Sequence, residues 1–196
     1  MKLRIASRIA GKEAEGPGRR YAVWVQGCTL RCPGCCNPEM FAKVGAGELF
    51  DTLEIADEIL ATPNIEGLSV LGGEPFQQAE ALAELCSVVR AQRLSVMVFS
   101  GYTLAELQSG TIDAAAALLA HVDLLVDGRF EASLVDERRR WIGSTNQQLH
   151  FLSDRYSPHD NRFNQPNSIE IRLVGGELTI NGWPATANAA MLRTRS

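Results

Sequence analysis

The chain of 196 residues carries 19 Lys and Arg against 23 Asp and Glu, a formal net charge of -4. Such a chain has no global field that would gather nucleic acid or an anionic membrane, so we expect neither as a partner. The N-terminus lacks an apolar run of signal-peptide length, and no run reaches the roughly 18 apolar residues of a membrane span. We therefore expect a cytoplasmic protein whose cysteines stay reduced.

The sequence predicts strands and helices that alternate along the chain. Short β-rich runs end in Gly or Pro, which predicts strands that stop at loops. Helices are predicted where Asp51 and Glu54 form a capping box and where Leu82, Leu85 and Val89 share one helical face. In chain order we expect a strand at 21–27, a helix at 51–61, a strand at 66–75, a helix around 82–89, a strand at 94–101, helical segments at 103–108 and 113–122, and a strand at 122–128.

This order of elements predicts an α/β fold with a largely parallel sheet, either doubly wound or curled into a partial (β/α) barrel. Residues 168–183 alternate apolar and polar side chains around Gly175 and Gly176, which predicts a C-terminal β-hairpin extension. No internal repeat or linker divides the sequence. We therefore expect a single domain over residues 1–196, with its core at about 16–152.

Four of the five cysteines lie within nine positions. Cys28, Cys32 and Cys35 have the spacing C-x3-C-x2-C, which places three thiolates around a small volume. A structural zinc site uses four protein ligands, and a 4Fe-4S cluster is usually held by four cysteines, so three leave one iron open to a substrate. Cys36 is the surplus cysteine, because side chains of adjacent residues diverge from a compact site.

Two other interpretations of this loop remain open. Cys32 and Cys35 have the C-x-x-C form of a thiol redox pair, and a zinc-bound interaction module is a further alternative. The upstream Cys28 argues against both. The sequence GGEP at 72–75 is by itself a tight turn after a strand, and it gains significance because it follows the cysteine loop.

Six segments of the chain form an ordered set of motifs: GPGRR (16–20), GCTLRCPGCCN (27–37), GGEP (72–75), SGYTLAEL (100–107), VDLLVDGRF (122–130) and WIGSTNQQLHFL (141–152). With these motifs the chain resembles the radical S-adenosylmethionine superfamily, and within it the small activating proteins of anaerobic ribonucleotide reductases. Relatives generally carry an aromatic residue or His at the position of Cys36, and Arg at that of Ile142.

The resemblance implies an enzyme that reductively cleaves S-adenosylmethionine at a 4Fe-4S cluster, giving a 5'-deoxyadenosyl radical. The cluster ligands would be Cys28, Cys32 and Cys35. The residues expected around S-adenosylmethionine are Gly72, Gly73 and Glu74 at its methionine moiety, Ser100 and Asp127 at the ribose, Arg129 at a carboxylate and Gly34 at the adenine.

The resemblance also implies two partners: a glycyl-radical enzyme such as an anaerobic ribonucleotide reductase, and an electron donor such as flavodoxin or ferredoxin. A second class remains open, a radical enzyme that acts directly on a small molecule or a peptide. The sequence alone does not separate the two.

Overall fold

The computed structural model describes residues 1–174 and 177–182. The strands are β1 (Lys2–Lys12), β2 (Arg20–Val25), β3 (Glu48–Asp51), β4 (Gly67–Gly72), β5 (Ser95–Phe99), β6 (Leu124–Asp127), β7 (Gln148–Phe151), β8 (Ile169–Val174) and β9 (Glu177–Gly182). The α-helices are α1 (Thr52–Leu60), α2 (Ala79–Ala91), α3 (Leu104–Gln108) and α4 (Ala115–Leu119). Short 3-10 helices are η1 (Pro38–Phe41), η2 (Pro75–Gln78), η3 (Ala132–Leu134) and η4 (Asn161–Asn164).

Seven strands form one open mixed sheet in the order β3-β1-β2-β4-β5-β6-β7. The α/β class is confirmed, and the central strands β2, β4, β5 and β6 pair in parallel as expected. The strands toward both edges of the sheet pair antiparallel. The prediction of a largely parallel sheet is therefore correct only for the four central strands. A partial barrel is not confirmed, because the sheet ends at β3 and β7 and does not close.

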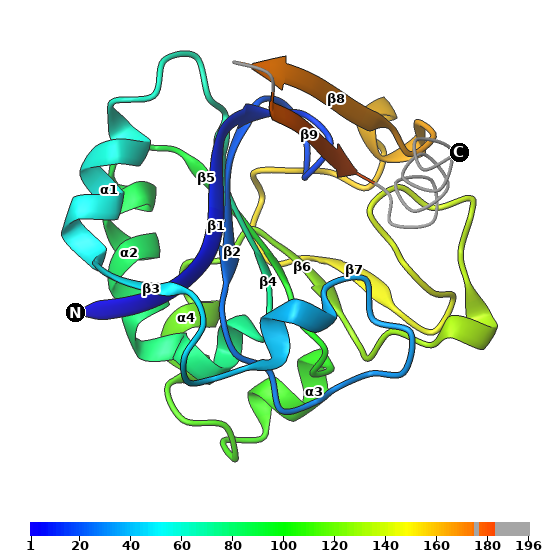
Figure 1. Ribbon diagram of the computed structural model, residues 1–196. Helices are drawn as coiled ribbons and strands as arrows, with labels where there is room; N and C mark the ends of the chain where they lie inside the picture. Colours follow the sequence, from blue (N-terminus) through cyan, green and yellow to red (C-terminus); the bar gives the residue numbers. More distant parts are fainter. Residues whose placement is uncertain (175–176, 183–196) are drawn as a thin grey trace.

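The helices pack on one face of this sheet (Figure 1). Leu85, Cys86 and Val89 of α2 are fully buried against the alternate residues Val70 of β4 and Val98 of β5. Because side chains alternate along a strand, the intervening residues point to the opposite face, which is left for a site. Within the described part of the chain, no helix is long and apolar enough to cross a membrane.

The predicted helix start at Asp51 is confirmed by its hydrogen bonds. The Leu53 amide donates to Asp51 Oδ1 at 3.0 Å, and the Asp51 amide donates to Glu54 Oε2 at 3.3 Å. These two bonds satisfy amides that the first turn of α1 leaves without helical partners.

The predicted C-terminal hairpin is confirmed for its two strands, β8 and β9, which pair with each other alone. Residues 175–176 and 183 of the predicted range lie outside the described residues. The hairpin contacts the end of β1, where the Glu13 amide donates to Glu170 Oε2 at 3.1 Å.

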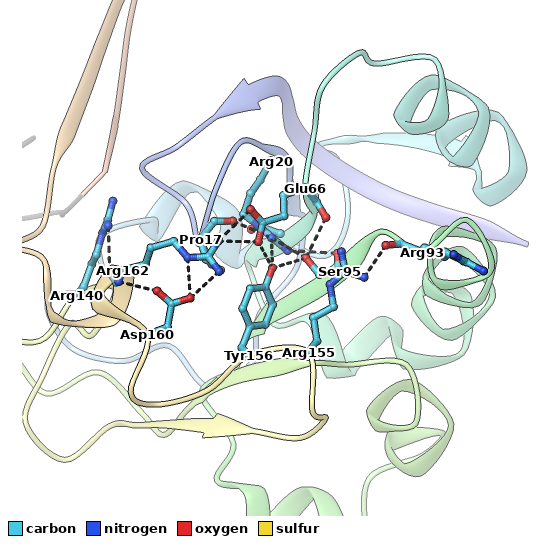
Figure 2. A network of polar contacts seen from close by, with 11 residues as sticks. Pro17, Arg20, Glu66, Arg93, Ser95, Arg140, Arg155, Tyr156, Asp160 and Arg162 are labelled. Atoms are coloured by element: carbon cyan, nitrogen blue, oxygen red, sulfur yellow. Dashed lines mark hydrogen bonds and ion pairs between the residues drawn. The ribbon is translucent and has the colours of Figure 1, made fainter.

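A buried cation fixes the edge of the sheet where the parallel strands begin. Arg20 has no exposed surface, and its guanidinium donates to Ser69 Oγ at 2.6 Å and to Ser95 Oγ at 2.9 Å. Tyr156 bridges Ser95 and Glu66 with oxygen–oxygen distances of 2.7 Å each, which joins the segment after β7 to this network (Figure 2). The Arg20 network thus lies where the parallel strands begin, and the long loops follow the strands at their other, C-terminal ends.

Candidate cluster and cofactor site

A cavity of about 870 Å³ lies where β2, β4, β5 and β6 end. The cysteine loop follows β2 and GGEP follows β4, and these strands are parallel neighbours, so both loops emerge at the same edge. The predicted site residues that line this cavity are Cys28, Cys32, Gly34, Cys35, Gly72, Gly73, Glu74 and Ser100. Asp127 and Arg129 are not among its lining residues.

The cysteine loop is closed at its base by backbone hydrogen bonds. The Gly27 amide donates to the Met40 carbonyl at 2.9 Å, and the Cys28 amide donates to the Phe41 carbonyl at 3.3 Å. Gln26, just before the loop, donates its side-chain amide to the Ala42 carbonyl at 2.8 Å. These hydrogen bonds hold the two ends of the loop together, so that residues 28–41 form a closed loop at the cavity.

The thiols differ in burial and acidity. Cys28 is buried, Cys32 and Cys35 are partly buried, and Cys36 is exposed. The neighbouring Cys36 thiol lowers the pKa of Cys35, and the Asn37 amide donates to Cys35 Sγ at 3.4 Å, whereas burial raises the pKa of Cys32. The thiolate is the form of cysteine that binds metal.

The spacing of the three thiols bears on the kind of metal site that they could form. In the described part of the chain, no three Cys, His, Asp or Glu side chains gather closely enough to hold one metal ion. The thiolates of a cluster bind different irons and need only surround a common space. Cys28, Cys32 and Cys35 all line the same cavity, as ligands of one cluster would have to.

Two glycines bring the GGEP turn against the cysteine loop. Gly72 has φ of +102°, and a Cβ there would lie 2.7 Å from the Val25 amide nitrogen. A Cβ on Gly73 would overlap the carbonyl oxygen of Gly27, to which the Glu74 amide donates at 2.9 Å. The two loops pack so closely that a side chain would not fit at Gly72 or Gly73. This adds to the role expected from the sequence, in which the glycines let the backbone approach a ligand.

Glu74 joins the ends of β4 and β5. Its side chain is 1% exposed, and it accepts hydrogen bonds from the Phe76 amide at 3.0 Å, Ser100 Oγ at 2.9 Å and the Gly101 amide at 2.8 Å. Burial raises the pKa of Glu74 to about 7. A carboxylate offers about four lone-pair positions, so roughly one remains for a ligand.

Asp127 and Arg129 lie beside the cavity, around the start of α3. Asp127 Oδ2 accepts from the Leu104 amide at 2.6 Å and lies 2.9 Å from His150 Nε2. Arg129 Nη1 donates to both carboxylate oxygens of Glu106 at 3.1 Å. Along β6, Val126 faces the cavity, so the alternation of the strand turns the next residue, Asp127, away from it.

Gln147, which the sequence did not single out, holds the part of the cavity wall formed by the loop before β7. Gln147 lines the cavity and accepts from the amides of Gly143 and Ser144 at 3.0 and 3.1 Å. Its own amide donates to the Gly128 carbonyl at 2.7 Å, which ties this loop to the end of β6. The residue lies within the predicted 141–152 motif, but a lone Gln carries no pattern that would single it out.

Comparison with known proteins assigns the family. The model of the 4Fe-4S single cluster domain matches residues 14–150. A Vibrio cholerae protein is 36% identical over 144 residues, 69% of this chain and 89% of that protein. Relatives from Escherichia coli K12 and Enterobacteria phage T4 are 34% and 31% identical over 146 and 152 residues, 70% and 74% of this chain and 91% and 92% of their own.

All three relatives are named anaerobic ribonucleoside-triphosphate reductase-activating protein. The matched range contains the cysteine loop and GGEP and stops before β8, so it omits the C-terminal hairpin. The resemblance inferred from the motifs is thus confirmed: the chain belongs to the family of anaerobic ribonucleoside-triphosphate reductase-activating proteins, with a 4Fe-4S single cluster domain.

Proposed function

We propose that the protein is a radical S-adenosylmethionine enzyme that installs a glycyl radical in a partner such as an anaerobic ribonucleotide reductase. The observation that carries the proposal is the union of the cysteine loop, the GGEP turn and the end of β5 around one cavity, through hydrogen bonds of Glu74 to Gly27, Ser100 and Gly101. The names of the relatives support the choice of partner.

Cys28, Cys32 and Cys35 would hold the cluster, with Cys36 outside the ligand set. When bound, the cluster supplies the single electron that splits S-adenosylmethionine into methionine and a 5'-deoxyadenosyl radical, and hydrogen transfer to that radical leaves the glycyl radical on the partner. The electron would come from a donor such as flavodoxin or ferredoxin.

The chain's own residues would bind and orient S-adenosylmethionine. The remaining lone pair of Glu74 can accept from the ammonium of the methionine moiety, next to the backbone of Gly72 and Gly73. Ser100 would meet the ribose, and Gly34 would lie by the adenine. Both line the cavity, which supports these assignments.

Asp127 and Arg129 do not line the cavity, but Gly128 between them does, so both lie next to it in the chain. Asp127 would meet a ribose hydroxyl and Arg129 a carboxylate at the rim. Arg129 would have to exchange its contact with Glu106 for the ligand, a small cost because such an exposed ion pair contributes about 1 kcal/mol or less.

We also propose that residues 1–196 form one domain, a core at about 16–152 in the manner of a partial (β/α) barrel, with the hairpin at 168–183 as its extension. Because the three ligand cysteines must stay reduced, we place the protein in the cytoplasm.

Transfer of a labelled hydrogen tests the proposal. The reduced, reconstituted protein is mixed with S-adenosylmethionine and a candidate reductase that carries deuterated glycine. We expect deuterium in 5'-deoxyadenosine together with a persistent glycyl signal in electron paramagnetic resonance. Deuterium that arrives from a small metabolite or free peptide, with no protein radical, would support the alternative class of enzyme.

A further inference from the structure

Away from the cysteines, the cavity is walled by apolar side chains. The face of the sheet that carries no helices contributes Trp24 of β2, Leu71 of β4 and Phe99 of β5. Ile142 and Val135 line the same cavity from the segment between β6 and β7. We call the space among these five residues the apolar chamber.

The charge of the cavity wall restricts what can enter the chamber. Of the lining residues that the structure describes, the charged ones are Glu15, Glu39 and Glu74, and none is Lys, Arg or His. A phosphorylated or acidic ligand would find no cation to replace its lost hydration there. An uncharged apolar group would instead gain from leaving water.

Arg139 lies near the cavity but does not supply a cation to its wall. Arg139 Nη1 donates to the Gln147 carbonyl at 2.9 Å, and Nη2 donates to the Thr145 carbonyl at 3.0 Å. Its Nε pairs with Asp136 at 2.6 Å. The guanidinium therefore organises its own loop instead of facing the cavity.

We propose that the apolar chamber receives an apolar side chain that flanks the target glycine in a polypeptide segment of the partner. The inference rests on the proposed function and names the kind of segment that it acts on. Chamber and cysteine loop line one cavity, so a side chain seated in the chamber keeps the adjacent glycine backbone in the same cavity as the cysteines. A glycine there allows close approach because it has no side chain.

Peptide binding tests the preference without turnover. The probes are blocked pentapeptides with a central Gly flanked by Leu, by Asn of similar size, or by Glu. Titration calorimetry uses the reconstituted protein with its cluster oxidised and S-adenosylmethionine bound. We expect the Leu-flanked peptide to bind tighter than the Asn-flanked one by about tenfold to a hundredfold, and the Glu-flanked peptide to bind weakest.

Three results would overturn the inference: equal or tighter binding of the Asn or Glu peptide, no binding of the Leu peptide at millimolar concentration, or equal binding of N-acetyl-leucinamide. The last result would assign the chamber to a small molecule. Failure of the proposed function is distinguishable, because it appears as an absent cluster, or as absent cleavage of S-adenosylmethionine once the same preparation is reduced.

Two adjacent residues provide matched variants. Val135 lines the cavity and is 40% exposed, whereas Leu134 is 41% exposed and is not among the lining residues. We expect Val135→Lys to reduce the preference for Leu over Asn by about tenfold and Leu134→Lys to preserve it. Equal effects of the two substitutions would place the peptide outside the chamber.

Discussion

Glu74 Oε1 accepts a hydrogen bond from Ser100 Oγ at 2.9 Å, which joins the ends of the neighbouring strands β4 and β5 inside the candidate site. Two residues predicted to bind different parts of one ligand thus also bind each other. The pair fixes the separation of the two loops before any ligand arrives, so removal of either side chain affects the shape of the site as well as its contacts.

Removal of the Glu74 carboxylate is expected to weaken the binding of S-adenosylmethionine and the fold together. Glu74→Ala loses a charged hydrogen bond of about 1.5–3 kcal/mol to the ligand, roughly a tenfold to hundredfold loss of affinity. It also leaves the buried donors Phe76 N and Gly101 N unpaired. Calorimetric titration and thermal unfolding measure the two effects.

Asp127→Ala serves as the comparison, because Asp127 contacts Leu104 and His150 beside the cavity. Because the Asp127 side chain points away from the cavity, we expect it to weaken binding less than Glu74→Ala does, while iron content stays near normal in both variants. Unchanged dissociation constants in both would remove these residues from the site.

The raised pKa of Glu74 predicts a pH dependence of stability with a definite sign. The folded protein holds the Glu74 proton up to a pKa of about 7, above the ordinary value of 4.5. The folded state therefore binds more protons than the unfolded state between these values, and its stability falls as pH rises through this window. The full effect is on the order of 3 kcal/mol.

Glu74→Gln removes this titration while it keeps the size of the side chain. We expect the difference in unfolding free energy between wild type and Glu74→Gln to shift with pH between about 4.5 and 7 and to be flat above and below. A difference that stays constant across this range would show that Glu74 titrates normally.

Each of Cys28, Cys32 and Cys35 is expected to be necessary for the cluster, because loss of one thiolate exposes a second iron. Cys36→Ala should retain it, because Cys36 lies outside the proposed ligand set. Iron and sulfide content after anaerobic reconstitution measures both. Normal cluster content in alanine variants of the first three cysteines would refute the ligand set.

A methyl group on Gly73 is expected to displace the cysteine loop. In Gly73→Ala the new Cβ overlaps the Gly27 carbonyl, so we expect lower stability and poor retention of the cluster. Gly45→Ala is the control: nothing lies within 4 Å of its Cβ, and only its φ of +77° adds strain. If Gly45→Ala lowered cluster content as much as Gly73→Ala, the effect of Gly73→Ala could not be assigned to the contact with the Gly27 carbonyl.

The junction of the cysteine loop and GGEP was predictable because both follow strands whose β-rich runs and glycine stops are local signals. β1 was not predicted, although Leu3 and Ile5 alternate toward the core, because Lys2, Arg4 and Arg8 interrupt the apolar pattern. Antiparallel pairing at the edge formed by β3, β1 and β2 was missed together with that strand.

Two features of the site region depend on geometry that the sequence does not display. Asp127 points away from the cavity because strand alternation starts from Val126, and that phase is set by the pairing of β6 with β5. Charged residues are mostly exposed, so a buried Arg20 is unexpected; its partners Ser69, Ser95 and Tyr156 lie 49, 75 and 136 residues away in sequence.

Arg20 provides the last prediction, which separates stability from the chemistry of the site. The guanidinium is fully buried where the parallel strands begin, and its burial lowers its pKa. Figure 2 shows the polar contacts around it. Arg20→Met removes the charge and leaves Ser69 and Ser95 without this donor. We expect unfolding to become easier by roughly 2–4 kcal/mol, because several hydrogen bonds of a buried charged group are lost at once.

Arg155→Ala is the matched control, because Arg155 is exposed and donates to the Arg93 carbonyl in the same region at 2.6 Å. We expect it to change the unfolding free energy by about 0.5 kcal/mol or less. Because Arg20 and its partners Ser69, Ser95 and Tyr156 are not among the residues that line the cavity, folded Arg20→Met should bind S-adenosylmethionine with wild-type affinity at a temperature well below its unfolding midpoint. A loss of affinity without loss of stability would instead connect this network to the site.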